Sequence, residues 1–236
     1  GALRCGVMPA ASFSHALRDT HPGPGELRPV RPVALAPPAC RHEIQAALQA
    51  PQASICPKYF YDQRGSELFE AITRLPEYYL TRTERALMRL HGRAIAAAVG
   101  AGRVVIEPGA GSCDKARALC RSLAATHFVG VDISADYLHG AIARLRKALP
   151  GLDARAVGGD ITAGLRLPPD IPAERRLVFY PGSSIGNFDP SQAVALLAQM
   201  RTLAQSGGAL LVGIDLPKDR AVLEAAYDDA AGVTAA

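Results

Sequence analysis

Residues 104–115 constrain the fold most, because they combine a strand, a glycine turn and a helix start in the run V-V-I-E-P-G-A-G-S-C-D-K. A β-branched stretch ends in Glu107, and Gly109 and Gly111 follow it. Glycines permit a sharp turn and a close approach to a ligand, and a helix start offers unpaired N–H groups. Asp114 stands where a G-x-G-x-x-G motif has its third glycine. The stretch therefore predicts either a loop for a nucleotide-type ligand or an ordinary strand–loop–helix turn.

Strand-like and helix-like patterns alternate from this loop onward. Apolar strands are expected at residues 104–107, 128–132, 154–157, 177–180 and 209–215. Helices are expected at about residues 113–125, 135–149, 190–204 and 218–228. Alternating β and α segments with apolar strands predict a parallel sheet that is covered on both faces. Ligands of such sheets bind beyond the carboxyl ends of the strands.

The segment before the sheet is predicted to be helical. A short helix is expected over residues 42–50, and the apolar spacing within residues 68–75 predicts a second helix that Pro76 ends. The sequence T-R-T-E at residues 81–84 matches a capping box. We therefore expect a third helix over residues 85–99.

Aromatic side chains gather at residues 59–79, although the whole chain is only 6% aromatic. A half-buried packing layer is the structural interpretation of this cluster. That interpretation fits Tyr61 and Tyr78 less well, because they lie at the ends of predicted elements and their hydroxyls need hydrogen-bond partners.

Polar residues follow the predicted strands at the edge where a ligand would bind. Asp132 suits the two hydroxyls of a ribose, and Asp160 suits an adenine amino group. Each acid alone is more often a strand-end or helix-capping residue, but their joint placement, with Asn187 after the fourth strand, favours a ligand site. Glu107 would repel a pyrophosphate and attract an ammonium or sulfonium. The pattern therefore favours S-adenosylmethionine over NAD.

Composition argues against several other classes of protein. The formal charge is +4, and residues 1–42 carry five arginines against two acids, so no basic face indicates a nucleic-acid partner. No apolar run has the length of a membrane span, and no His/Cys cluster has the spacing of a metal site. Five cysteines without a C-x-x-C pair indicate reduced thiols in a cytoplasmic protein. We expect no metal, no nucleic acid, no membrane and a monomer.

Longer motifs carry a resemblance that covers about residues 57–236. They are Y-F-Y-D-x-R-G-S-x-L-F-E-x-I-T-R-L-P-E-Y-Y at 59–79, E-x-G-x-G-S-x-x-K at 107–115, G-S-S-I-G-N at 182–187, and D-L-x-K-D-x-x-x-L-x-x-A-Y-D-D-A-A-G-V-T-A at 215–235. Together they resemble the histidine-specific N-alpha-methyltransferase family of ergothioneine biosynthesis. The resemblance implies a Rossmann-like class I methyltransferase fold with a separate substrate domain, S-adenosylmethionine as cofactor, and methylation of the α-amino group of L-histidine towards trimethylhistidine, hercynine.

The resemblance also implies roles for individual residues. The residues implied to bind the cofactor are Tyr61, Gly109, Lys115, Asp132, Asp160 and Ile161. Among them, Lys115 would lie near the methionine carboxylate, Asp132 at the ribose, and Asp160 with Ile161 at the adenine. The residues implied to bind L-histidine are Tyr78, Asn187 and Tyr227.

The catalytic hypothesis concerns Asn187 and Tyr61. Methyl transfer is an in-line displacement that depends largely on positioning, and the attacking amine must first lose a proton. We expect both residues to orient the amine by hydrogen bonds, with water as the proton acceptor. The structural alternatives are a loop or capping residue for Asn187 and a solvated surface charge for Lys115.

These motifs divide the chain into four expected parts. They are a flexible leader at 1–41, an N-terminal helical portion of the substrate domain at 42–100, an S-adenosylmethionine-binding domain at 101–216, and the start of a truncated substrate-binding region at 217–236. Family members continue past the G-V-T-A run, so the C-terminal part of the sheet and of the substrate domain is expected to be missing. Two alternative functions stay open: a truncated, non-catalytic cofactor-binding module and, less favoured, an NAD-linked oxidoreductase.

Overall fold

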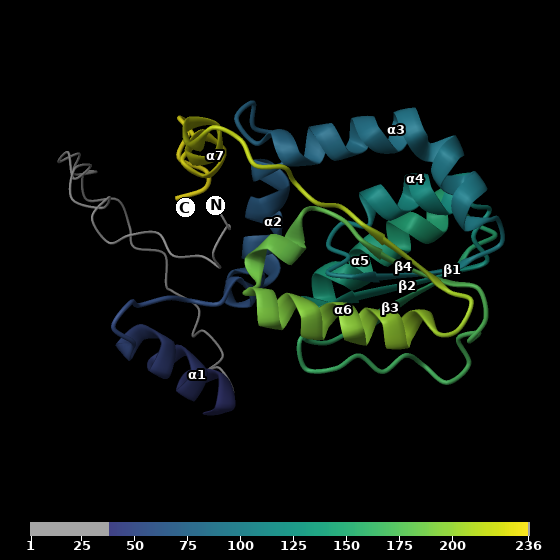
Figure 1. Cartoon of the computed structure of the whole chain (residues 1–236), viewed down its shortest axis with the longest axis horizontal. Coiled ribbons are helices and arrows are strands. Elements are labelled where there is room, and N and C mark those ends of the chain that lie inside the picture. Colours follow the sequence, from purple (N-terminus) through teal and green to yellow (C-terminus); the bar gives the residue numbers. More distant parts are fainter. Residues whose placement is uncertain (1–37, 236) are drawn as a thin grey trace, which may run out of the picture.

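A computed structural model describes residues 38–235 of the chain (Figure 1). The predicted leader lies outside the described residues except for residues 38–41. Those four residues already belong to the first helix, α1 (Pro38–Gln49), which therefore begins before the predicted residue 42. No helix within residues 38–235 combines the length and the apolar character that a membrane crossing requires.

The described strands form a parallel five-stranded sheet in the order β3-β2-β1-β4-β5. Their bounds are β1 Val104–Pro108, β2 His127–Asp132, β3 Asp153–Gly158, β4 Arg176–Tyr180 and β5 Ala209–Val212. The predicted parallel α/β sheet is confirmed. Strand β5 is shorter than the predicted range 209–215. After the Gly213 amide donates to the Tyr180 carbonyl at 2.9 Å, the chain leaves the sheet.

Helices cover both faces of the sheet, as the apolar strands require. Helices α3 (Tyr79–Val99), α4 (Asp114–Ser122) and α5 (Ala135–Ala148) lie on one side, and α6 (Pro190–Ala204) lies on the other (Figure 1). The side chains of Val105 and Phe128 pack into the core beneath α4 and α5. Val178 and Tyr180 pack against α6 on the opposite face. Burial of each large apolar side chain stabilises the fold by about 1.5–3 kcal/mol.

The N-terminal helices differ from prediction at the proposed capping box. Helix α2 (Gln63–Ile72) is preceded by Asp62, whose carboxylate accepts the Gly65 amide at 2.7 Å, and it ends before Pro76. Helix α3 begins at Tyr79, so the T-R-T-E run lies inside the helix and the capping-box prediction is wrong. The Arg82 guanidinium holds the preceding turn instead, because it donates to the Leu75 carbonyl at 2.6 Å and to the Tyr78 carbonyl at 3.0 Å.

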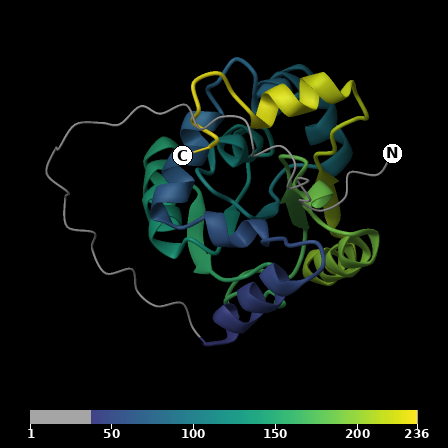
Figure 2. The same ribbon diagram turned by 90° about the vertical axis from the view of Figure 1, so that its left-hand side faces the viewer.

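Short elements complete the end of the sheet at which the strands terminate. They are the 3-10 helices η2 (Pro57–Phe60) and η3 (Ser184–Asn187) and the helix α7 (Arg220–Tyr227). Helix α7 is two residues shorter at its start and one at its end than predicted. Asp219 caps it by accepting the Ala221 amide at 2.8 Å. Helices α1, α2 and α7 lie around this end of the sheet (Figure 2).

Candidate active site

A cavity of about 890 Å³ opens beyond the carboxyl ends of the strands. Its wall combines η2 and α2 with the loops that follow β1, β2, β3 and β4. Of the predicted site residues, those that line it are Tyr61, Tyr78, Gly109, Lys115, Asp132, Asp160, Ile161 and Asn187. Tyr227 is not among the lining residues, but its ring centroid lies 5.9 Å from that of Tyr78.

The backbone of the glycine loop after β1 adopts a conformation that favours glycine at two positions. Gly109 and Gly111 have φ angles of +69° and +50°, which L side chains rarely adopt. A Cβ atom at either position would meet no atom within 4 Å, so the loop borders open space. The Gly109 amide donates to the Val131 carbonyl at 2.8 Å. The loop is thus fixed to β2 while its surface faces the cavity.

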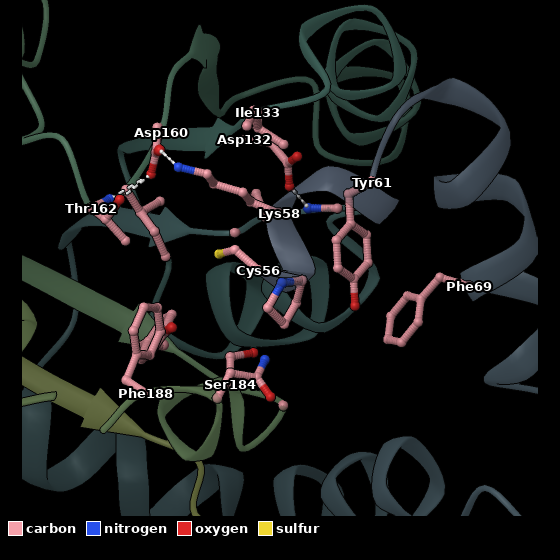
Figure 3. A pocket seen from close by; sticks show the side chains of 18 of the residues that line it. Cys56, Lys58, Tyr61, Phe69, Asp132, Ile133, Asp160, Thr162, Ser184 and Phe188 are labelled. Atoms are coloured by element: carbon pink, nitrogen blue, oxygen red, sulfur yellow. Dashed lines mark hydrogen bonds and ion pairs between the residues drawn. The ribbon is translucent and has the colours of Figure 1, made fainter. Parts of the chain in front are cut away.

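Asp132 joins this loop to the next one. Its Oδ2 atom accepts the Gly111 amide at 2.9 Å (Figure 3). Its Oδ1 atom accepts the Ser134 amide at 3.0 Å. Both carboxylate oxygens are therefore oriented by the backbone before any ligand is bound. Each oxygen retains a further lone pair that can accept a hydrogen bond.

Asp160 is already paired in this structure. Its Oδ1 atom accepts the Thr162 amide at 2.8 Å, and its Oδ2 atom lies 3.2 Å from the Lys58 ammonium (Figure 3). Burial raises the pKa of Asp160, but the hydrogen bonds from Thr162 and Lys58 outweigh it and lower the pKa overall. The Lys58 ammonium also lies 3.0 Å from Glu43 Oε2. Lys58 and Glu43 were not predicted from the sequence as site residues, although Lys58 directly precedes the aromatic motif at 59–79.

An ion pair and a backbone amide meet at Glu84. The Lys115 ammonium lies 2.8 Å from Glu84 Oε2, and Glu84 Oε1 accepts the Gly182 amide at 2.8 Å. The Lys115 side chain is only 22% exposed, which argues against a solvated surface charge. Glu84 was missed as a site residue because its spacing from Thr81 matched a capping box.

Glu107 lines the cavity and is only 1% exposed. Burial raises its pKa well above the usual value, and the nearby Lys115 opposes that effect. Glu107 Oε2 and the buried Tyr180 hydroxyl have no hydrogen-bond partner among the described residues, and both residues line the cavity. Because unpaired buried polar atoms cost free energy, the wall fits a ligand that brings polar or cationic groups.

Glu107→Gln should change how stability depends on pH. The pKa of Glu107 is higher in the folded protein than its ordinary value of 4.5, so its contribution to the free energy of unfolding falls as the pH rises above that value. Glutamine carries no charge at any pH, and the variant should lose less stability on alkalinisation. Melting temperatures at about pH 5 and about pH 8 test this. An equal decrease in melting temperature between about pH 5 and about pH 8 in wild type and variant would contradict this prediction.

The predicted aromatic residues form a chain of edge-to-face contacts. Ring centroids are 5.6 Å apart for Tyr61 and Phe69, and 6.0 Å apart for Phe69 and Tyr78. Tyr227 continues the chain beyond Tyr78. Burial raises the pKa of Tyr61 and of Tyr78. Both hydroxyls therefore remain protonated near neutral pH and can act as hydrogen-bond donors.

Asn187 ends η3 and lines the cavity from the loop after β4. The loop turns sharply, because Gly182 and Ser183 have φ angles of +83° and +56°. Asn187 does not cap helix α6, since Asp189 and Gln192 perform that role through a 3.1 Å hydrogen bond between the Asp189 amide and Gln192 Oε1. The amide side chain is thus placed at the cavity wall and is not a helix cap.

The side chains that could bind a metal ion are dispersed in the part of the chain that the structure describes. There, no three or more His, Cys, Asp or Glu side chains are grouped so that they could hold a metal ion. Cys56, Cys113 and Cys120 carry free thiols.

A protein-family model described as "Histidine-specific methyltransferase, SAM-dependent" matches residues 40–236. The chain is 43% identical over 202 residues to the histidine N-alpha-methyltransferase of Mycolicibacterium smegmatis and 39% identical over 201 residues to that of Mycobacterium tuberculosis. Each match covers 84% of this chain, and the chain spans 62% of the length of each relative.

One solved structure supports the fold alone. The magnesium protoporphyrin IX methyltransferase of Synechocystis, solved with bound S-adenosylmethionine, aligns with a TM-score of 0.50 and 16% sequence identity. The alignment covers 75% of this chain and 86% of that one. The predicted Rossmann-like class I methyltransferase sheet is thereby confirmed.

Proposed function

Because the chain belongs to the family of histidine-specific, S-adenosylmethionine-dependent methyltransferases, we propose that it methylates the α-amino group of L-histidine towards the trimethylated product. One observation carries the proposal. A single cavity brings the glycine loop and the acids at the strand ends together with Tyr61, Tyr78 and Asn187. We further propose that the protein acts in the cytoplasm as a monomer on this small-molecule substrate.

The residues at the glycine loop and the strand ends form the cofactor side of this proposal. S-adenosylmethionine supplies a methyl group on a sulfonium, which is open to attack by an amine. Asp132 would accept the ribose hydroxyls, and Asp160 with Ile161 would border the adenine. Lys115 would bind the methionine carboxylate as a charge-assisted pair. The unpaired oxygen of Glu107 and the open space at Gly109 and Gly111 support this placement.

The tyrosine cluster and Asn187 form the acceptor side. Tyr78 and Tyr227 would border the histidine, and Asn187 with Tyr61 would orient its amine by hydrogen bonds. The raised pKa values of Tyr61 and Tyr78 make these hydroxyls neutral donors and poor proton acceptors. A water molecule is therefore the proposed acceptor of the amine proton, and the side chains contribute chiefly by positioning.

Lys115→Ala should weaken S-adenosylhomocysteine binding about tenfold, because a charge-assisted hydrogen bond contributes about 1.5–3 kcal/mol. Isothermal titration calorimetry measures the change. Arg121→Ala is a matched control, since Arg121 lies exposed in the last turn of the same helix. Wild-type affinity in the Lys115 variant would remove this residue from the cofactor site.

Thermal-shift measurements separate the proposed function from its rivals. A ligand that binds the native state raises the melting temperature. We expect S-adenosylhomocysteine to raise it and NADH to leave it unchanged. A shift with NADH alone would favour the NAD-linked oxidoreductase instead. A further shift on adding L-histidine to the protein saturated with S-adenosylhomocysteine would support a shared acceptor site.

A further inference from the structure

Glu84 joins three elements that surround the cavity. It projects from helix α3, its Oε2 atom lies 2.8 Å from the Lys115 ammonium on α4, and its Oε1 atom accepts the Gly182 amide at 2.8 Å in the loop after β4. The Glu84 side chain is 17% exposed. A partly buried carboxylate whose two oxygens each have a hydrogen-bond partner is held in one orientation.

The backbone leaves room for this carboxylate at two glycines. A Cβ atom on Gly213 would lie 2.1 Å from Glu84 Oε1, and a Cβ atom on Gly182 would lie 3.1 Å from the Lys115 ammonium. Gly182 also has a φ angle of +83°, which favours glycine. The carboxylate and the ammonium therefore occupy a space that side chains at these two positions would fill.

We propose that Glu84 is a positioning residue for cofactor binding. It fixes the Lys115 ammonium at the place where the methionine carboxylate would bind, and it links that ammonium to the loop that leads to Asn187. This inference rests on the proposed function, because it assumes that Lys115 meets the cofactor carboxylate. An ammonium has three donors. One is directed to Glu84, and the other two remain for the ligand.

The test compares two ligands that differ in the methionine portion. S-adenosylhomocysteine carries the amino-acid carboxylate, whereas 5′-methylthioadenosine carries only the adenosine and thioether portion. With Glu84→Ala, we expect the dissociation constant for S-adenosylhomocysteine to rise about tenfold and that for 5′-methylthioadenosine to change by less than about twofold. General damage to the cavity would weaken both ligands alike.

Further variants keep the test independent of any folding defect. Gly213→Ala displaces the Glu84 carboxylate without removing it and should cause the same selective loss. Glu84→Gln keeps an acceptor for the Gly182 amide and should cause a smaller loss. Asp170→Ala removes an exposed ion pair with Arg155 and should leave both affinities unchanged.

The outcomes distinguish this inference from the proposed function. Unchanged or tighter S-adenosylhomocysteine binding in Glu84→Ala, or equal loss of both ligands, overturns the positioning role. If Lys115→Ala weakens S-adenosylhomocysteine binding while the Glu84 and Gly213 variants do not, the positioning role is wrong and the proposed function is unaffected. Wild-type protein that binds neither ligand overturns both.

Discussion

Asp132→Ala is expected to raise the dissociation constant for S-adenosylhomocysteine about a hundredfold, because two charge-assisted acceptors for the ribose are lost together. The same change removes the carboxylate that accepts the Gly111 and Ser134 amides at 2.9 and 3.0 Å. The glycine loop therefore loses its side-chain link to the end of β2, although the Gly109 amide still donates to the Val131 carbonyl. Isothermal titration calorimetry on the folded variant measures the combined effect.

Asp132→Asn separates the two contributions. Asparagine keeps one oxygen acceptor and should give an affinity between those of wild type and Asp132→Ala. Asp153→Ala serves as the control, because Asp153 lies at the amino end of β3, away from the cavity, and pairs with Arg155. An Asp132→Ala protein that binds S-adenosylhomocysteine as tightly as wild type would contradict the ribose assignment.

Asn187→Ala should lower kcat/KM for histidine methylation about a hundredfold, since the loss of an orienting contact displaces the amine from its attack geometry. Cofactor affinity should remain near wild type, because we propose that Asn187 contacts the acceptor and not the cofactor. Steady-state kinetics together with calorimetry test both parts of the prediction. Gln63→Ala removes an exposed amide on α2 and provides a control. Unchanged turnover in Asn187→Ala would exclude Asn187 from the reaction.

The sheet was predictable because its signals are local. Apolar β-branched runs alternate with helical patterns along the chain, and this alternation alone specifies parallel strands with helices on both faces. The strand ends then place Asp132 and Asp160 at one edge without knowledge of any contact. The end of β5 was misplaced because Ile214 extends the apolar run after the pairing with β4 has stopped.

The contacts that organise the cavity were not predictable in the same way. Glu84 and Lys115 are 31 residues apart, and Lys58 and Asp160 are 102 residues apart, so no local pattern indicates either pair. The sequence pattern predicted that Glu84 caps a helix. In the structure it pairs instead with Lys115 and the Gly182 amide. Tyr227 was assigned to the substrate from resemblance. The structure places its ring beside Tyr78, and its role in binding stays a prediction.

Methylation of histidine is tested most directly by mass spectrometry of L-histidine incubated with this chain and S-adenosylmethionine whose methyl group is isotopically labelled. We expect labelled methyl groups on the α-nitrogen, with one S-adenosylhomocysteine formed for each methyl transferred. Asn187→Ala protein provides the matched comparison and should form far less product. Binding of the cofactor without any methylated histidine would contradict the proposed function and favour a non-catalytic cofactor-binding module.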